Sequence, residues 1–143
     1  MANLIAGFAL AISLVSLGFS IYFGLRDRAR VKAESEFYLG LEGDAPHMVI
    51  SIVNAGRRSV LLTFFGGNDS QGDWAGTHLD SKGKGFRLAE GEKHRIDLYE
   101  DDLELETPEG IFIYKELWVE DTLGRRYAVK HSKEHIRCVR GGV

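Results

Sequence analysis

The chain opens with an uninterrupted apolar stretch, residues 4–25, which reads LIAGFALAISLVSLGFSIYFGL. It contains no Asp, Glu, Lys, Arg or His. As a helix rising about 1.5 Å per residue, it would span roughly 33 Å, the thickness of a bilayer's hydrocarbon core. The sequence therefore predicts a single transmembrane α-helix over residues 1–25 and a membrane-anchored protein.

Two other interpretations of this stretch stay open. A cleaved secretory signal has a basic start, a shorter apolar run and a small-residue cleavage site. Here Met1, Ala2 and Asn3 precede the run, and arginines stand where a cleavage site is expected. A buried helix of a soluble protein is the other alternative. Length and flanking residues favour an uncleaved anchor over both.

The charges beside the apolar stretch predict its orientation, since basic residues next to a span resist translocation. Asp27 is the only acidic residue among four basic ones in the flank that follows the stretch: Arg26, Arg28, Arg30 and Lys32. The N-terminus should therefore face outward and the larger domain should be cytoplasmic, at the inner membrane if the source is bacterial. The same side chains are candidates for contact with lipid headgroups.

Small residues recur along the apolar stretch at alternating steps of three and four. They form one stripe of the predicted helix: Ala6, Ala9, Ser13, Ser16, Ser20 and Gly24. In lipid, close approach over small residues is a main source of attraction between helices. The stripe is thus a candidate helix-packing seam, although Ala, Ser and Gly are common in membrane helices and such a spacing also arises by chance.

Residues 26–36 contain no Gly, Pro or aromatic residue and are rich in Arg, Ala, Lys and Glu. These residue types favour helix. We therefore expect residues 26–36 to extend the membrane helix as a juxtamembrane helical stalk.

From residue 37 onward, short apolar runs alternate with Gly, Asn and Asp. This sequence pattern predicts an all-β antiparallel sandwich over residues 37–143. The candidate strands are 37–41, 48–53, 60–65, 85–88, 94–98, 111–120, 125–130 and 136–139. The run 111–120 has the strongest strand character and should be central, while 54–56 and 121–124 are turn signals.

Strand number, spacing and the strand-turn-strand run at residues 52–60 resemble an immunoglobulin-like sandwich. The chain is similar to small bacterial or phage single-pass membrane proteins that join one helix to such a domain. The resemblance does not extend to antibody domains, because the Cys-Trp-Cys framework is absent. It implies no catalytic residues.

Composition narrows the classes of partner. Residues 37–143 contain 14 Lys and Arg against 18 Asp and Glu, so a nucleic-acid partner is not expected. Cys138 is the only cysteine, which excludes an internal disulfide and agrees with a reducing compartment. We expect no small-molecule substrate and no cofactor.

Several local clusters of polar side chains are candidate sites, but none has a pattern that predicts catalysis or metal binding. His131, His135 and Cys138 would share a helix face, but a closed zinc site needs a fourth ligand. The loop 66–85 has acidic residues without the calcium-loop pattern, and its 81–85 stretch lacks the phosphate-loop Gly-Lys-Ser/Thr. Glu100, Asp101, Asp102, Glu104, Glu106 and Glu109 read as a solvated face or an acidic docking surface.

Trp74, in the loop 66–85, is a candidate partner contact, because an aromatic side chain on an exposed loop often anchors a partner. The alternative is that this ring packs over its own sheet. The sequence as a whole predicts a non-catalytic, membrane-anchored protein-interaction module. The small-residue seam would let its helix self-associate. The alternative is a small accessory subunit that packs through its helix against a larger membrane complex.

Overall fold

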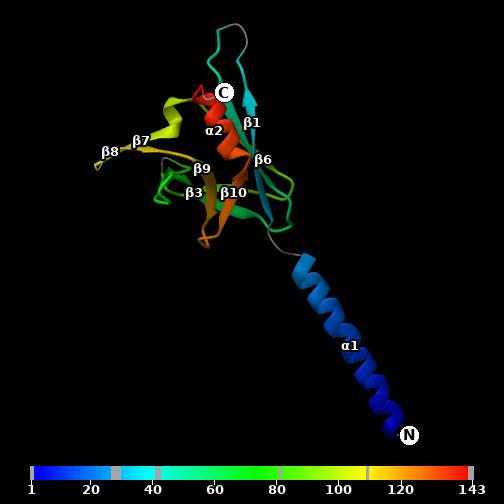
Figure 1. Ribbon diagram of the computed structural model, residues 1–143. Helices are drawn as coiled ribbons and strands as arrows, with labels where there is room; N and C mark the ends of the chain where they lie inside the picture. The colour runs from blue at the N-terminus through cyan, green and yellow to red at the C-terminus, as the bar shows by residue number, and fades with distance from the viewer. Residues whose placement is uncertain (1, 27–29, 41–42, 81, 109, 142–143) are drawn as a thin grey trace.

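The computed structural model describes residues 2–26, 30–40, 43–80, 82–108 and 110–141 (Figure 1). An N-terminal helix, α1 (Ala2–Arg26), stands apart from a β-rich domain. The domain contains, in chain order, β1 (Val31–Tyr38), β2 (His47–Asn54), β3 (Val60–Asn68), β4 (Trp74–His78), β5 (Phe86–Leu88), β6 (Lys93–Leu98), the 3₁₀ turn η1 (Asp101–Leu103), β7 (Glu104–Thr107), β8 (Gly110–Ile113), β9 (Glu116–Asp121), β10 (Arg126–Lys130) and α2 (Ser132–Val139).

Helix α1 is long and apolar enough to cross a membrane over Ile5–Gly24, where the mean hydropathy is 2.0 and no residue is buried by the rest of the chain. Two of its three serines have hydroxyl groups that are hydrogen-bonded within the helix. Ser13 and Ser20 donate to the carbonyls of Ala9 and Ser16, each at 2.9 Å, four residues earlier. Such bonds within the helix make serine tolerable in an apolar environment.

The β-rich domain is built on one curled sheet that forms a half-barrel. The strand order is β4-β3-β9-β10-β1-β2-β6, with β5 also pairing with β3, while β7 and β8 form a separate two-stranded sheet. Neighbouring strands are antiparallel except for β1 and β10, which run parallel with Ala33 opposite Val129. A register shift between Leu62 and Phe64 marks a bulge in β3, a feature that increases local bending and twist.

The core lies on the concave side of the curled sheet and follows the two-residue period of the strands. Met48, Ile50 and Ile52 of β2 are fully buried, and α2 adds Ile136 and Val139 to the same core. The immunoglobulin-like sandwich is not confirmed, because the main sheet curls around its core instead of packing face to face with a second large sheet. The broader expectation of an apolar helix followed by a mostly β domain is confirmed.

The predicted helical stalk over 26–36 is wrong for residues 31–36, which belong to strand β1. Ala33 and Ser35 are buried, while Lys32, Glu34 and Glu36 are exposed. Pairing with β2 along the whole strand and with β10 near Ala33 overrides the helical propensity of these side chains.

Other boundaries also differ from the expectation. Residues 136–139, predicted as a strand, lie in helix α2, whose buried positions Ser132, Ile136 and Val139 follow a helical period. The predicted strand 111–120 is interrupted at residues 114–115 and contributes to two sheets, β8 and β9. The loop 66–85 contains strand β4, which pairs with β3 from residue 64 to residue 68.

Candidate functional site

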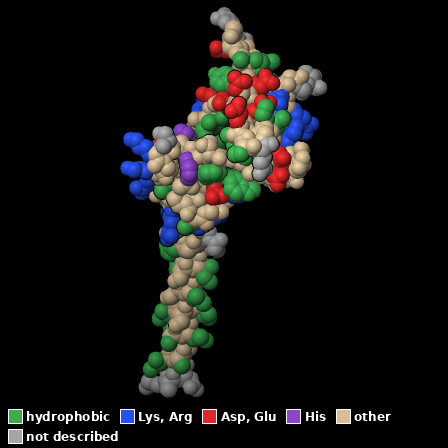
Figure 2. All heavy atoms as spheres, turned by 90° about the vertical axis from the view of Figure 1, so that its left-hand side faces the viewer, with side chains coloured by type: hydrophobic (Ala, Val, Ile, Leu, Met, Phe, Trp, Pro, Cys, Tyr) green, Lys and Arg blue, Asp and Glu red, His purple; other side chains and the backbone are tan. Residues whose placement is uncertain are grey.

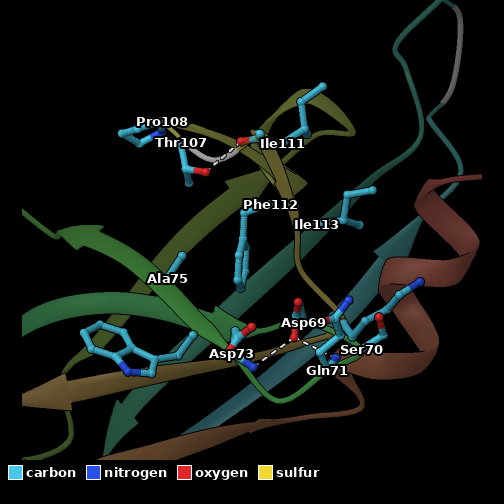
Figure 3. Close-up of a pocket in the computed structure, with 13 residues that line it drawn as sticks. Asp69, Ser70, Gln71, Asp73, Ala75, Thr107, Pro108, Ile111, Phe112 and Ile113 are labelled. Carbon is cyan, nitrogen blue, oxygen red and sulfur yellow. Dashed lines mark hydrogen bonds between the residues drawn. The ribbon is translucent and has the colours of Figure 1, made fainter.

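A groove of about 850 Å³ lies between strand β4 and the β7–β8 hairpin (Figure 3). Polar and apolar side chains line it in equal numbers: Asp69, Ser70, Gln71, Asp73, Trp74, Ala75, Thr107, Pro108, Gly110, Ile111, Phe112, Ile113 and Lys115. Among the described residues, β4 pairs only with β3 and β8 pairs only with β7. The groove is therefore bordered by two strands that each have an unpaired edge.

The floor of the groove is a tight turn between β3 and β4, which the Asp69 carboxylate organises. One oxygen of that carboxylate accepts the backbone N–H groups of Gln71, Gly72 and Asp73 at 2.7, 2.8 and 3.0 Å. Gly72 has a φ of +94°, which a side chain would strain. The neighbouring Asp73 carboxylate is exposed beside the groove.

The opposite wall is the β7–β8 hairpin. Figure 3 shows the Phe112 ring pointing from β8 into the groove, toward the turn that contains Asp69 and Asp73. Ile111 on the same strand is 65% exposed. The hairpin tip is closed by the Thr107 hydroxyl, which donates to the carbonyl of Gly110 at 2.7 Å. An ion pair of 2.8 Å between Arg140 and Glu104 ties the hairpin base to the end of α2.

The aromatic side of the groove continues onto the outer face of the sheet. Trp118 of β9 is buried, and its indole N–H donates to the side-chain oxygen of Asn68 at 3.0 Å. The Arg126 guanidinium lies 4.1 Å from the Trp118 ring centre and 4.9 Å from that of Trp74, which gives two cation–π contacts. A Cβ at Gly66 would lie 2.8 Å from the Trp118 ring, so this glycine makes room for the indole.

A polar cluster supports the base of this wall. Asn68 donates to Glu116 at 2.9 Å, and Lys133 forms an ion pair with the same carboxylate at 2.7 Å. The hydrogen bond from Lys133 holds the pKa of Glu116 below its ordinary value. Burial opposes this effect, and the Asn68 hydrogen bond and the Lys133 charge add smaller lowering effects. The cluster joins β3, β9 and α2 directly behind the groove.

Trp74, the predicted partner contact, lies on the rim of the groove and is 57% exposed. It is the first residue of β4, so it lies on a strand and not in a free loop. The sequence analysis missed Ile111, Phe112 and Asp73 as parts of the same site. The apolar run at residues 111–113 was the available signal, but no local sequence pattern predicts that this run lies beside β4.

The other predicted site residues lie elsewhere. The seam residues Ala6, Ala9, Ser13, Ser16, Ser20 and Gly24 are exposed along α1. Arg30 and Lys32 are exposed where β1 begins, whereas Arg28 and the side chain of Arg26 lie outside the described residues. The acidic run contributes η1 and β7, where the Asp102 carboxylate accepts the Tyr99 N–H at 2.9 Å; Glu109 lies outside the described residues.

His131, His135 and Cys138 do not form a ligand cluster. His135 Nδ1 lies 2.9 Å from the Ser35 hydroxyl, which itself donates to the Lys130 carbonyl at 2.8 Å. Cys138 is exposed. No group of three or more His, Cys, Asp and Glu side chains in the described part of the chain is arranged to hold a metal ion.

No family model matches, and no curated protein matches. One solved structure, described as the X-ray structure of Northeast Structural Genomics Consortium target SoR45, is similar over 73% of this chain and 83% of its own, with 11% identity and a TM-score of 0.30. At this level of similarity, neither fold nor function transfers from it.

Proposed function

We propose that this protein is a membrane-anchored, non-catalytic binding module in which α1 spans a bilayer and the groove beside β4 captures an extended segment of a protein partner. The observation that carries the proposal is the groove itself, because two strands with unpaired edges border one concave surface. An extended peptide gains backbone hydrogen bonds from such an edge and specificity from side-chain pockets.

The lining indicates the chemistry of the partner. Trp74, Ile111 and Phe112 offer large apolar surfaces, and Asp73 adds a carboxylate at the floor. These residues suit a segment in which apolar side chains are followed by a Lys or Arg. Binding is a better match than catalysis, because the described residues of the lining include no His or Cys and the Asp69 carboxylate is engaged in its turn.

The second candidate function is an accessory subunit that packs through the small-residue seam of α1. The hydroxyls of Ser13 and Ser20 are already bonded within the helix, so the seam offers close packing and not free donors. Because this candidate uses α1 and the first uses the groove, the location of the partner distinguishes the two.

Site-specific photocrosslinking of the full chain in native membranes tests both. A benzophenone amino acid replaces Trp74 or Ile111 in the groove, Ser16 or Ser20 in the seam, or Leu39 as a control that is 75% exposed outside both sites. Adducts from the groove positions that disappear with Asp73→Lys support the first function. Adducts confined to the seam positions support the accessory subunit, and equal labelling from Leu39 contradicts a specific groove.

A further inference from the structure

The fold gathers separate segments at the end of the domain where the chain arrives from α1. Helix α1 ends at Arg26 and β1 begins at Val31. The Arg30 carbonyl accepts the N–H of Ala55 at 2.7 Å, which brings the β2–β3 turn to this point. The Asn54 carbonyl accepts the N–H of Gly91 at 2.8 Å, which adds the β5–β6 turn.

The β9–β10 turn lies at the same end, because β10 runs parallel to β1 with Ala33 opposite Val129. Figure 1 shows this turn on the side of the domain that faces the end of α1. We call these segments, residues 30–32, 55–59, 89–93 and 122–126, the α1-proximal end. Four residues, 27–30, separate α1 from β1 along the chain, so this end of the domain is close to α1 in sequence.

The α1-proximal end is basic although the whole chain carries a formal net charge of −3. Its acidic residues are Glu90 and Glu92, and Glu92 is engaged with the Ala89 N–H at 2.7 Å. Its basic residues are all exposed: Arg30, Lys32, Arg57, Arg58, Lys93, Arg125 and Arg126. Two of them already have acidic partners, since Arg126 pairs with Glu120 at 2.8 Å and Arg125 with Asp121 at 4.0 Å. The attraction to anionic lipid is therefore assigned mainly to the other five. Figure 2 shows Lys and Arg side chains next to α1 and a cluster of Asp and Glu at the opposite end of the domain.

An apolar side chain projects from the same surface. Leu123, at the β9–β10 turn, is 70% exposed. The buried Asp121 carboxylate holds this turn by accepting the N–H groups of Leu123 and Arg125, both at 2.9 Å. Gly124 completes the turn with a φ of +72°. Leu123 is thus presented by a fixed turn and is followed by the basic pair Arg125 and Arg126.

We propose that the α1-proximal end docks on the anionic leaflet of the membrane, with its basic side chains at the lipid phosphates and Leu123 inserted between the headgroups. Basic residues near a surface are attracted to anionic lipid, and an apolar side chain flanked by them is suited to the interface. The inference rests on the proposed span of α1. Docking in this orientation leaves the β3–β4 turn and the β7–β8 hairpin, which border the groove, on the side of the domain away from α1.

The test uses the full chain in nanodiscs of phosphatidylcholine alone or with added phosphatidylglycerol. In a Cys138→Ser background, Leu123→Cys carries an environment-sensitive NBD label, and Leu39→Cys is the matched control at the opposite end. We expect a blue-shifted emission at position 123 that is quenched by spin-labelled lipid and grows with anionic lipid. Position 39 should stay water-exposed in both lipids.

Charge reversal supplies the second arm. Arg57→Glu with Arg58→Glu should remove the lipid-dependent shift at position 123, whereas Lys115→Glu with Arg137→Glu, the same charge change at the opposite end, should preserve it. A chain that enters nanodiscs but keeps position 123 in water overturns the docking alone. A chain that does not enter nanodiscs overturns the span and the docking together, and a shift that ignores lipid charge contradicts the role of the basic residues.

Discussion

The two ends of the β-rich domain are built differently from the same strands. At the α1-proximal end, buried polar side chains fix the turns: Asn54 is fully buried, and Asp121 is 5% exposed. At the opposite end, β8 belongs with β7 to a separate two-stranded sheet, and the groove lies between this hairpin and β4 of the main sheet. The comparison teaches that buried polar side chains close the turns at one end, while a hairpin outside the main sheet leaves a groove at the other.

The largest expected effect is a loss of stability, and it should distinguish a buried tryptophan of the groove wall from the exposed one on its rim. Trp118→Ala should destabilise the domain by about 3–5 kcal/mol, because the indole is buried and hydrogen-bonded to Asn68. Trp74→Ala should cost under about 1 kcal/mol, since that ring is mostly exposed. Urea unfolding in mild detergent, followed by the remaining tryptophan of each variant, measures both, as both tryptophans of the chain lie in this domain.

Equal losses for Trp74→Ala and Trp118→Ala would mean that the rim is part of the core. The groove would then lack the exposed aromatic contact on which the proposed capture of a partner depends.

A smaller effect should distinguish the two ends directly. The Asn54 side chain donates to the carbonyls of Arg58 and Leu88 and accepts the N–H of Gly56, at 2.8, 3.1 and 3.0 Å. Asn54→Ala leaves these groups unpaired, so we expect a loss of about 2–3 kcal/mol in the free energy of unfolding. Asp102→Ala, which removes one exposed bond at the other end, should cost under about 1 kcal/mol.

The same urea titration compares these two variants. If Asp102→Ala destabilises the domain as much as Asn54→Ala, the distinction between a closed end and an open end has no energetic basis.

The smallest expected effect is a pH dependence behind the groove. The Lys133 hydrogen bond lowers the pKa of Glu116 in the folded state, so its stabilisation is present above the unfolded pKa and is lost as the pH falls through the folded value. Because both partners are more than a third exposed, the contribution should be well under about 1 kcal/mol. Glu116→Gln should flatten the dependence of the urea midpoint on pH below about pH 5, while Glu134→Gln should leave it unchanged.

Much of the fold could be predicted from local patterns. The apolar helix and the strands at β2, β3, β6 and β10 follow from periodicity and turn residues. The errors lie where tertiary pairing overrides local preference: residues 31–36 are rich in helix formers but form β1 between β2 and β10. Residues 136–139 are too short an apolar segment to distinguish a strand from a helix by pattern.

The candidate site was predicted only in part. Trp74 was named as a candidate because an aromatic side chain on an exposed loop often anchors a partner. Ile111 and Phe112 were assigned to a central strand, because an apolar run carries no signal for the residue at which the chain passes from one sheet to another.

The sequence by itself determined the apolar helix with its basic flank and the β-rich character of the remainder, because length, charge and two-residue alternation are local properties. Only the tertiary structure decided which segments meet. The parallel pairing of β1 with β10 carries Leu123 to the α1-proximal end, and the separate β7–β8 hairpin brings Phe112 opposite Asp73. Both juxtapositions depend on contacts between residues far apart in the chain, which no local pattern encodes.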